Sequence, residues 1–177
     1  GPGRTILETA ESIDGRRIRI IIAGFSAASG DPDAYLSEAR KRGLPVQPII
    51  ERKAYDWRII KQVLRVIDEH KVDVLHTHDF RSDVVGLFCA AARKVPIVTT
   101  CNGWISNNLK GRIYTWIDKS ILRYFDHIVT VSSAMKRQLQ SAGLPDSKVE
   151  VIPNALKVGD FVVDKKDRSF RNELNIP

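Results

Sequence analysis

The sequence is poor in cysteine and has no long apolar run and no internal repeat, and each absence removes a class of protein. Its two cysteines, Cys89 and Cys101, lack the spacing of a zinc site or a disulfide framework, so we expect buried free thiols. No apolar stretch approaches the roughly 18 residues of a membrane span. The N-terminus also lacks the pattern of a secretory signal, so we expect a cytoplasmic protein.

The chain does have a basic surplus and enough apolar residues for one domain. Of its 177 residues, 43% are hydrophobic, which suits a single globular domain with a substantial core. Lys and Arg number 28 against 21 Asp and Glu, a formal net charge of +7. This surplus favours anionic partners such as phosphates, nucleic acid or acidic lipid, although it is also typical of a merely solvated surface.

Short β-branched runs alternate with amphipathic segments along the chain. Because several of these runs are apolar on both faces, they predict an α/β fold with an open, mainly parallel sheet and helices on both faces. The predicted strands cover residues 17–25, 45–50, 72–78, 95–101, 127–132 and 149–153. The predicted helices cover residues 5–12, 32–42, 56–70, 82–92, 110–125 and 133–142.

Two patterns within the predicted helices are specific. Gly43 and Gly143 follow helices at the point where a left-handed residue closes the last turn. In the third helix, one apolar stripe recurs at helical spacing and should face the sheet: Trp57, Ile60, Leu64 and Ile67.

Two histidines alternate at the end of the strand predicted at 72–78. His76 and His78 fall on one side of it, at the carboxyl end, where open α/β sheets bind ligands. Asp79 and Asp83 follow, so the group resembles half of a zinc-hydrolase cluster. No further histidine has ligand spacing, and a hydrogen-bonded polar strand end is the commoner arrangement. We expect no metal.

The next strand ends in "TTCNGW", at the same edge of the predicted sheet. Asn102 offers a donor and an acceptor, Gly103 lets a backbone come close, and Trp104 offers a stacking face. By itself the segment fits a turn around a buried tryptophan equally well. Its position beside the histidines favours a ligand-binding loop.

The chain opens on "GPGR" and enters a helix with no strand before it. Gly1, Gly3 and Arg4 fit a phosphate site on free N–H groups and the helix dipole, but an ordinary turn or a cloning remnant fits equally well. In a doubly wound sheet the preceding strand is central, and its loss would leave buried edges unpaired. We therefore expect a strand that this sequence does not include, with Gly1 to Gly3 emerging at the carboxyl edge of the sheet.

The helix predicted at 110–125 is basic and amphipathic. Such a helix lies on an anionic membrane in some proteins. More often it packs on its sheet and leaves a solvated basic face, here carrying Lys110, Arg112, Lys119 and Arg123.

Taken together, the glycine turn, "DVLHTHDFRSD", "TTCNGW" and "FDHIVTVSSAMKRQLQSAGLPDSKVEVIPNAL" resemble the N-terminal domain of family 4 glycosyltransferases. Enzymes of this family have two Rossmann-like domains that face across a cleft, an arrangement called GT-B. The resemblance implies that residues 1–154 form the acceptor-side domain without its first strand. It also implies that residues 155–177 form the interdomain linker and the start of an absent donor-binding domain.

The resemblance implies transfer of a sugar from a nucleotide-sugar donor to a glycan or lipid-linked acceptor, with retention at the anomeric carbon and without a metal. The nucleotide-sugar is a co-substrate, and no other cofactor is implied. A role in cell-envelope polysaccharide synthesis follows, with possible peripheral contact at the inner face of a membrane and no nucleic-acid partner. The isolated domain should be inactive.

The resemblance also assigns residues. It implies that Asn154 is the hinge, and that Gly1, Gly3 and Arg4 form the donor phosphate loop. It implies that Asn102 occupies the position of the family's usual catalytic histidine, which puts a proton-carrying role there in doubt. Ala155 departs from the family's Asn-Gly pair. The implied acceptor-binding residues are His76, His78, Asp79, Arg81, Gly103, Trp104 and Ser132.

Two other classes of protein stay open at this point. A non-catalytic Rossmann-like module for a phosphorylated ligand would also explain Asn102. A nucleic-acid binder is supported only by the charge, because the chain lacks the interleaved aromatic and basic residues of a recognised module.

Overall fold

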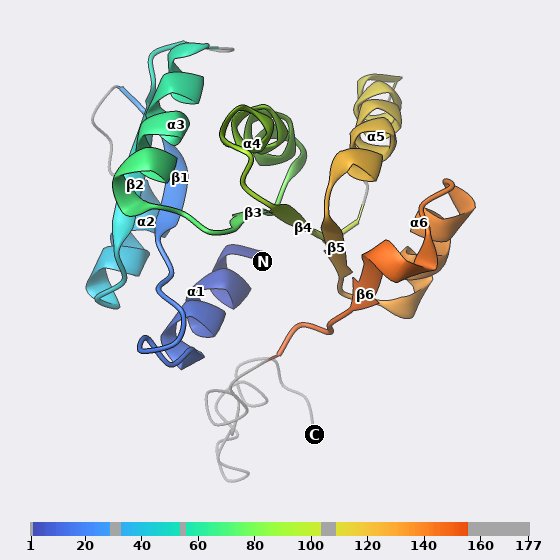
Figure 1. Cartoon of the computed structure of the whole chain (residues 1–177), viewed down its shortest axis with the longest axis horizontal. Helices are drawn as coiled ribbons and strands as arrows, with labels where there is room; N and C mark the ends of the chain where they lie inside the picture. The colour runs from blue at the N-terminus through green and yellow to red at the C-terminus, as the bar shows by residue number, and fades with distance from the viewer. Residues whose placement is uncertain (1, 29–32, 54–55, 104–108, 156–177) are drawn as a thin grey trace, which may run out of the picture.

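Parallel strands alternate with helices along the chain, as the sequence predicts (Figure 1). The computed structural model describes residues 2–28, 33–53, 56–103 and 109–155. The strands are β1 (Ile22–Ala27), β2 (Val46–Glu51), β3 (Leu75–Thr77), β4 (Ile97–Cys101), β5 (His127–Thr130) and β6 (Val149–Val151). The helices are α1 (Pro2–Ser12), α2 (Ala34–Lys41), α3 (Arg58–His70), α4 (Phe80–Arg93), α5 (Leu109–Ile121) and α6 (Ser133–Ser141), with short 3₁₀ turns at Leu122–Tyr124 and Asp146–Lys148.

The strands form two sheets rather than the single one expected. One has the order β1-β2 and the other the order β3-β4-β5-β6, and every pair is parallel. Helices α1 and α2 lie on one side of the strands, and α4, α5 and α6 on the other (Figure 1). The α/β class with parallel strands between helices is therefore confirmed. No hydrogen bond joins β1 to β3 among the residues described.

The first strand is shorter than predicted, and the expectation that it starts at residue 17 was wrong. The backbone N–H groups of Arg17 and Ile18 donate to the Asp14 carbonyl oxygen at 2.9 and 3.1 Å, which makes a turn. The Ile18 side chain is 56% exposed. Only the stretch that starts at Ile22 has a partner in β2, so the apolar pattern before it cannot continue the strand.

Helix α3 buries or half-buries the predicted stripe except for its first member, Trp57. Its core side chains are Ile59 and Ile67, whereas Trp57 is 78% exposed. Trp57 is the N-cap residue of α3, at the very end of the helix, and its assignment to the core was wrong. The left-handed residues expected after α2 and α6 are confirmed, with φ of 72° at Gly43 and 90° at Gly143.

Two apolar clusters hold the fold together. The smaller lies where α1 and α2 cover the β1-β2 pair and contains Leu7, Ile22, Leu36 and Ala39. The larger lies between the four-stranded sheet and α4 to α6. Its buried members are Ala90, Ile97, Cys101, Leu122, Phe125, Ile128, Met135, Leu139, Leu144 and Val149. Both cysteines are buried free thiols, as expected.

Helix α5 is only partly covered. Trp116 is 70% exposed, while Phe125, just beyond the 3₁₀ turn, is fully buried. Within the described ranges, no helix combines the length and apolarity needed to cross a bilayer.

Candidate functional site

The predicted ligand-binding residues of two strands gather at the carboxyl edge of the larger sheet. β3 pairs with β4 so that His76 lies opposite Val98 and Thr77 opposite Thr99. The chain then leaves β3 through His78 and leaves β4 through Asn102. Since parallel strands end at the same edge, both exits belong to one site.

The two histidines lie on one side of the strand, as their alternation predicts, and their rings are stacked. The ring centroids of His76 and His78 are 4.2 Å apart, with 30° between the ring planes. Nε2 of His76 lies 2.8 Å from Oγ1 of Thr100, within hydrogen-bond distance. These contacts fix the ring of His76 across the two strands.

The protein environment favours the uncharged form of both rings. Partial burial, together with the charge that His76 would carry, lowers the pKa of His78 to about 3. Although His76 keeps an exposed edge, the protein around its ring lowers its pKa below the usual 6.5. At neutral pH the pair therefore offers neutral nitrogens, each able to donate or accept a hydrogen bond.

Asp79 and its neighbours build the start of α4. The Asp79 carboxylate accepts a hydrogen bond from the Ser82 N–H at 2.9 Å. The Ser82 hydroxyl oxygen in turn accepts from the N–H groups of His78 and Asp79, both at 3.1 Å. This reciprocal cap fixes the backbone directly after the histidines. Asp79, a predicted acceptor-binding residue, therefore caps the N-terminus of α4 in this structure.

A buried polar cluster lies beneath the histidines, and Asp83 is its centre. Asp83 is 4% exposed and accepts hydrogen bonds from the hydroxyls of Thr77 and, at 2.8 Å, Thr99. Burial raises the pKa of Asp83 to about 6, against the opposing effect of these two hydrogen bonds. The carboxylate is therefore turned into the layer between α4 and the sheet rather than toward the histidines.

A zinc site gains no support from this geometry. Across the described ranges, no three His, Cys, Asp or Glu side chains come close enough to hold an ion. Sequence reasoning singled out Asp83 as a possible ligand but missed its threonine partners. The sequence did contain a signal for them. Thr99 and Thr100 are adjacent in β4, so their side chains point to opposite faces and one of the two must lie on the side away from His76.

Helix α4 lies close enough to β3 that only glycine fits at position 86. A Cβ there would lie 2.6 Å from Cγ2 of Thr77 and 3.3 Å from Cδ1 of Ile97. Close approach of the helix brings Asp83 within reach of both threonines, so Gly86 sets the position of the buried cluster.

The loop after β4 begins inside the described residues and then leaves them. Asn102 is exposed, and its side-chain amide lies 3.4 Å from the Thr100 carbonyl oxygen, a long hydrogen bond. Gly103 has φ of +124°, which side chains rarely tolerate. Trp104, the predicted stacking residue, lies outside the described residues.

Ser132 and Asn154 occupy the neighbouring strand ends. Ser132 is the N-cap of α6, and its hydroxyl oxygen accepts from the Met135 N–H at 3.2 Å. Asn154 is exposed in the segment after β6. The structure does not bring either residue into contact with the histidine pair, so their binding and hinge roles stay predictions.

The predicted phosphate loop is helical where it is described. Gly3 and Arg4 belong to the first turn of α1, and Gly1 lies outside the described residues. Nε of Arg4 lies 2.5 Å from a carboxylate oxygen of Glu8, so the guanidinium is already paired. Arg81 is also engaged, because its guanidinium covers the ring of Phe25 and pairs with Glu51.

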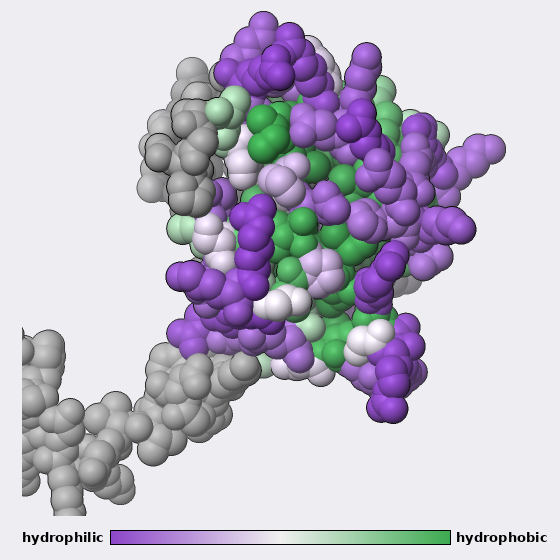
Figure 2. All heavy atoms as spheres, turned by 90° about the vertical axis from the view of Figure 1, so that its left-hand side faces the viewer, coloured by the Kyte–Doolittle hydropathy of each residue, from purple (hydrophilic) through white to green (hydrophobic). Residues whose placement is uncertain are grey.

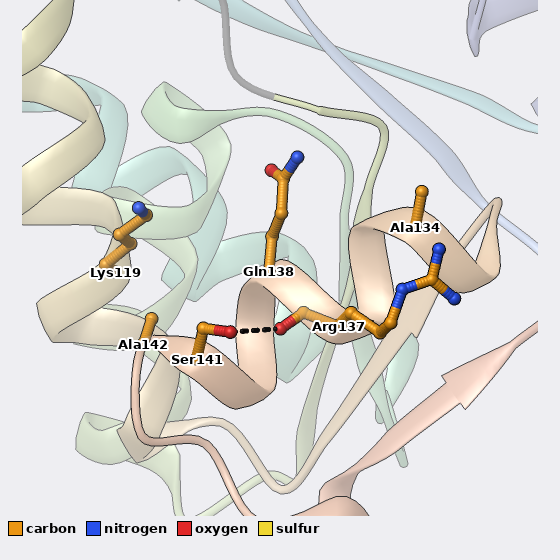
Figure 3. Close-up of a pocket in the computed structure, with 6 residues that line it drawn as sticks. All are labelled: Lys119, Ala134, Arg137, Gln138, Ser141 and Ala142. Atoms are coloured by element: carbon orange, nitrogen blue, oxygen red, sulfur yellow. Dashed lines mark hydrogen bonds between the residues drawn. The ribbon is translucent and has the colours of Figure 1, made fainter.

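One surface hollow lies elsewhere. It measures about 500 Å³ and opens between α5 and α6, lined by Lys119, Ala134, Arg137, Gln138, Ser141 and Ala142 (Figure 3). None of the predicted site residues lines it, and its polar contacts include a hydrogen bond from the Ser141 hydroxyl to the Arg137 carbonyl at 2.9 Å.

We place the candidate site at the carboxyl edge of the larger sheet, where the uncharged histidines lie beside the end of β4.

The comparison with protein families agrees with the fold. The family described as Glycosyltransferase Family 4 matches residues 1–158, nearly the whole chain, and the chain belongs to this family. No curated protein matches the sequence.

Solved structures share the fold. A structure of Anabaena Alr3699/HepE in complex with UDP-glucose has a TM-score of 0.78 at 15% identity, with 99% of this chain and 46% of that chain covered. A glycosyltransferase from Rickettsia africae has a TM-score of 0.69 at 18% identity, again covering 99% and 46%. This chain therefore spans less than half the length of these proteins. The likeness confirms a Rossmann-like domain of the GT-B fold.

Proposed function

We propose that this chain is the acceptor-side domain of a glycosyltransferase that moves a sugar from a nucleotide-sugar donor to a glycan or lipid-linked acceptor. Membership of Glycosyltransferase Family 4 supports the reaction class. The structural relatives include proteins crystallised with UDP or UDP-glucose, which supports a nucleotide-sugar as the donor. Most contacts to that donor belong to a second domain that this sequence does not contain.

One observation carries the proposal: the stacked, uncharged pair of His76 and His78 at the carboxyl edge. Sugar hydroxyls are neutral groups that both donate and accept, and neutral imidazole nitrogens match them in both capacities. A phosphate would be better served by a cationic pair. The geometry therefore favours binding of a hydroxyl-rich acceptor at this edge.

The finer steps of the proposal concern mechanism. The reaction proceeds with retention and without a metal, and Asn102 supplies a hydrogen bond to a sugar hydroxyl rather than a proton. If transfer instead needs an imidazole at this position, Asn102→His in the full-length protein raises kcat. An unchanged or lower rate supports the hydrogen-bonding role of Asn102.

The first experiment uses the full-length protein and this chain side by side. Both are assayed with a panel of uridine- and guanosine-linked sugars and candidate acceptors. We expect transfer by the full-length protein and none above a no-protein control by the isolated chain, because transition-state contacts are divided between the domains. Turnover by the isolated chain would contradict the proposal. Ligand binding without any transfer by the full-length protein would favour a non-catalytic module for a phosphorylated ligand.

The second experiment assigns the site. His78→Ala in the full-length protein should raise KM for the acceptor about tenfold, as expected for the loss of one or two hydrogen bonds, and leave KM for the donor unchanged. His127→Ala is the matched control, because His127 sits on β5 and pairs with Glu150 at 3.3 Å. A rise in the donor KM instead would contradict an acceptor role.

A further inference from the structure

Thr100 lies on the same side of the sheet as the histidine pair. In the register of β3 and β4, His76 is opposite Val98, and Thr100 follows Val98 toward the carboxyl edge. Side chains two positions apart on a strand share a face, whereas the adjacent Thr99 points the other way and bonds to Asp83. Thr100 is half-buried. It therefore borders the candidate site rather than the polar cluster beneath it.

The hydroxyl of Thr100 has a single partner among the described residues, Nε2 of His76 at 2.8 Å. A hydroxyl and a neutral imidazole can each donate or accept, so the distance alone allows two arrangements. Either the Nε2–H donates to the hydroxyl oxygen, or the hydroxyl donates to a bare Nε2. Only the second arrangement gives the hydroxyl proton an acceptor within the described part of the chain. It is therefore favoured, because the first leaves a half-buried hydroxyl with its proton unbonded.

This arrangement decides which ring nitrogen of His76 carries the proton. Burial lowers the pKa of His76, so at neutral pH the ring is uncharged and has one N–H. With Nε2 bare, that proton sits on Nδ1. The stack on His78, with 4.2 Å between ring centroids, holds the plane of the ring. Among the described residues no hydrogen bond engages Nδ1, so its N–H is a donor that a ligand can use.

The carbonyl of Thr100 acts on the residue that follows β4. The side-chain nitrogen of Asn102 donates to this carbonyl oxygen over 3.4 Å, a long hydrogen bond. A carbonyl oxygen accepts and cannot donate, so the amide turns its nitrogen toward Thr100 and its Oδ1 away. Asn102 is exposed, so a ligand can reach Oδ1 as an acceptor. One threonine thus orients a donor on β3 and an acceptor after β4.

We propose that Thr100 is a positioning residue of the acceptor site. Its hydroxyl holds His76 in the tautomer with the proton on Nδ1, and its carbonyl holds Asn102 with Oδ1 outward. The carboxyl edge then offers one donor and one acceptor. A sugar hydroxyl satisfies both, whereas a phosphate dianion cannot donate to Oδ1. The ligand class rests on the proposed function, but the tautomer of His76 can be tested without it.

Nitrogen NMR of the full-length protein with isotope-labelled histidine tests the tautomer, because protonated and bare ring nitrogens have well-separated shifts. The His76→Gln variant identifies the signals of His76. At neutral pH we expect a protonated Nδ1 and a bare Nε2 in the wild type and in Thr100→Ser. Thr100→Val keeps the shape of the side chain without the hydroxyl, and should lower the ratio of the Nδ1–H to the Nε2–H form about fivefold, the value of one hydrogen bond. A protonated Nε2 in the wild type, or an unchanged ratio in Thr100→Val, would overturn the proposal.

The titration of His76 gives a second readout whose sign separates the two arrangements. A hydroxyl that donates to Nε2 stabilises only the neutral ring, since the charged ring has no lone pair there. Thr100→Val should therefore raise the pKa of His76, and Thr100→Ser should stay close to the wild type. The stacked His78, with a pKa of about 3, stays neutral while His76 titrates. A lower pKa of His76 in Thr100→Val would mean that the Nε2–H is the donor, and would overturn the assignment.

Steady-state kinetics connects the tautomer to the acceptor. The full-length protein is assayed with whichever member of the acceptor panel gives transfer. Thr100→Val should raise KM for the acceptor about fivefold and leave KM for the donor unchanged, and Thr100→Ser should restore the wild-type value. A lost tautomer preference with an unchanged acceptor KM would contradict the acceptor role in the proposed function, while the positioning of His76 would stand.

Gln62→Leu is the control for a loss of stability alone. At the outer edge of β2, the side-chain amide of Gln62 donates to the Ile50 carbonyl and accepts from the Ile50 N–H, each at 2.8 Å. Figure 2 shows apolar atoms in the middle of this face, within a polar rim. Neither bond involves β3 or β4, so Gln62→Leu should lower the urea midpoint without changing the His76 tautomer or the acceptor KM. If Gln62→Leu shifts the tautomer as far as Thr100→Val does, general destabilisation is the cause and the positioning role is overturned.

Discussion

The guanidinium carbon of Arg81 lies 4.4 Å from the centroid of the Phe25 ring, so the first turn of α4 contacts β1 through this side chain. The same guanidinium pairs with Glu51 at the end of β2. One side chain thus contacts both strands of the smaller sheet from the larger one. Because Arg81 follows His78 by three residues, this contact also ties the candidate site to the N-terminal part of the fold.

Loss of this bridge should cost stability. Arg81→Met keeps an apolar stem but removes the charge, and we expect a loss of about 1 kcal/mol, the sum of a partly exposed cation–π contact and a weak ion pair. Urea unfolding of Arg81→Met, Phe25→Leu and the double variant measures the coupling. Arg16→Met is the control, because Arg16 is 91% exposed in its pair with Asp14. Strict additivity of Arg81 and Phe25 would contradict the contact.

The buried carboxyl of Asp83 should make stability depend on pH. Its pKa is raised from 3.8 to about 6 by burial, so the protonated form is favoured in the folded chain. This contribution is fully present below pH 3.8 and is lost as the pH rises through 6, on the order of 3 kcal/mol in total. Asp83→Asn resembles the protonated acid and should abolish this part of the slope in urea unfolding between pH 4.5 and 7.5.

Asp68→Asn is a suitable comparison for that measurement. Hydrogen bonding to Arg93 lowers the pKa of the exposed Asp68 carboxyl, so its titration lies below the window tested. The Asp68 variant should keep the wild-type slope. Identical slopes in wild type and Asp83→Asn would show that Asp83 is ionised throughout.

The close packing of α4 on β3 should tolerate no added methyl group. Gly86→Ala places a Cβ 2.6 Å from Cγ2 of Thr77, and we expect a loss of about 1–3 kcal/mol as the helix moves away. Gly15→Ala is the control, since no atom lies within 4 Å of its added Cβ. Thermal unfolding measures both. Equal stability of the two variants would mean that the helix moves at little cost.

The histidine pair should stay neutral well below pH 6.5. With its pKa near 3, His78 should show the NMR signature of an uncharged ring at pH 5, and His76 should titrate below 6.5. Because both pKa values are lower in the folded chain than in the unfolded chain, protonation favours unfolding. The free energy of unfolding should therefore fall as the pH drops from 6.5 toward 3. The chain in urea, where histidines return to about 6.5, is the reference. A normal titration of His78 in the folded chain would remove the basis for a neutral site.

The sequence could predict the order of elements and the gathering of the candidate residues of β3 and β4 at one edge, because both follow from periodicity and from the geometry of parallel strands. The placement of His76 and His78 on one side of the strand followed from their alternation, whereas the stacking of their rings was not predicted. Trp57 could not be placed in this way, because a residue at the very end of a helix is covered only if another segment packs beside it, and periodicity does not show which segments do.

The buried cluster around Asp83 also could not be predicted from the local sequence pattern. An aspartate four residues after a helix cap looks exposed or ligating in sequence, and only the close approach of α4 at Gly86 brings it to Thr77 and Thr99. Interactions between distant segments decide such positions. The division of the strands into two sheets depends likewise on which edges find partners.

The presence of two separate apolar clusters has a consequence for how the chain opens. The cluster of Leu7, Ile22, Leu36 and Ala39 shares no residue with the larger one, and side-chain bridges such as that of Arg81 connect the two regions. Cooperative unfolding requires that losing one part destabilises the rest, and here helix α3, which packs against both β2 and α4, carries most of that linkage. The segment from α1 to β2 should therefore come apart before the sheet from β3 to β6 only where α3 first releases β2, so variants that loosen Gln62 from Ile50 should open the N-terminal part selectively under mild denaturant.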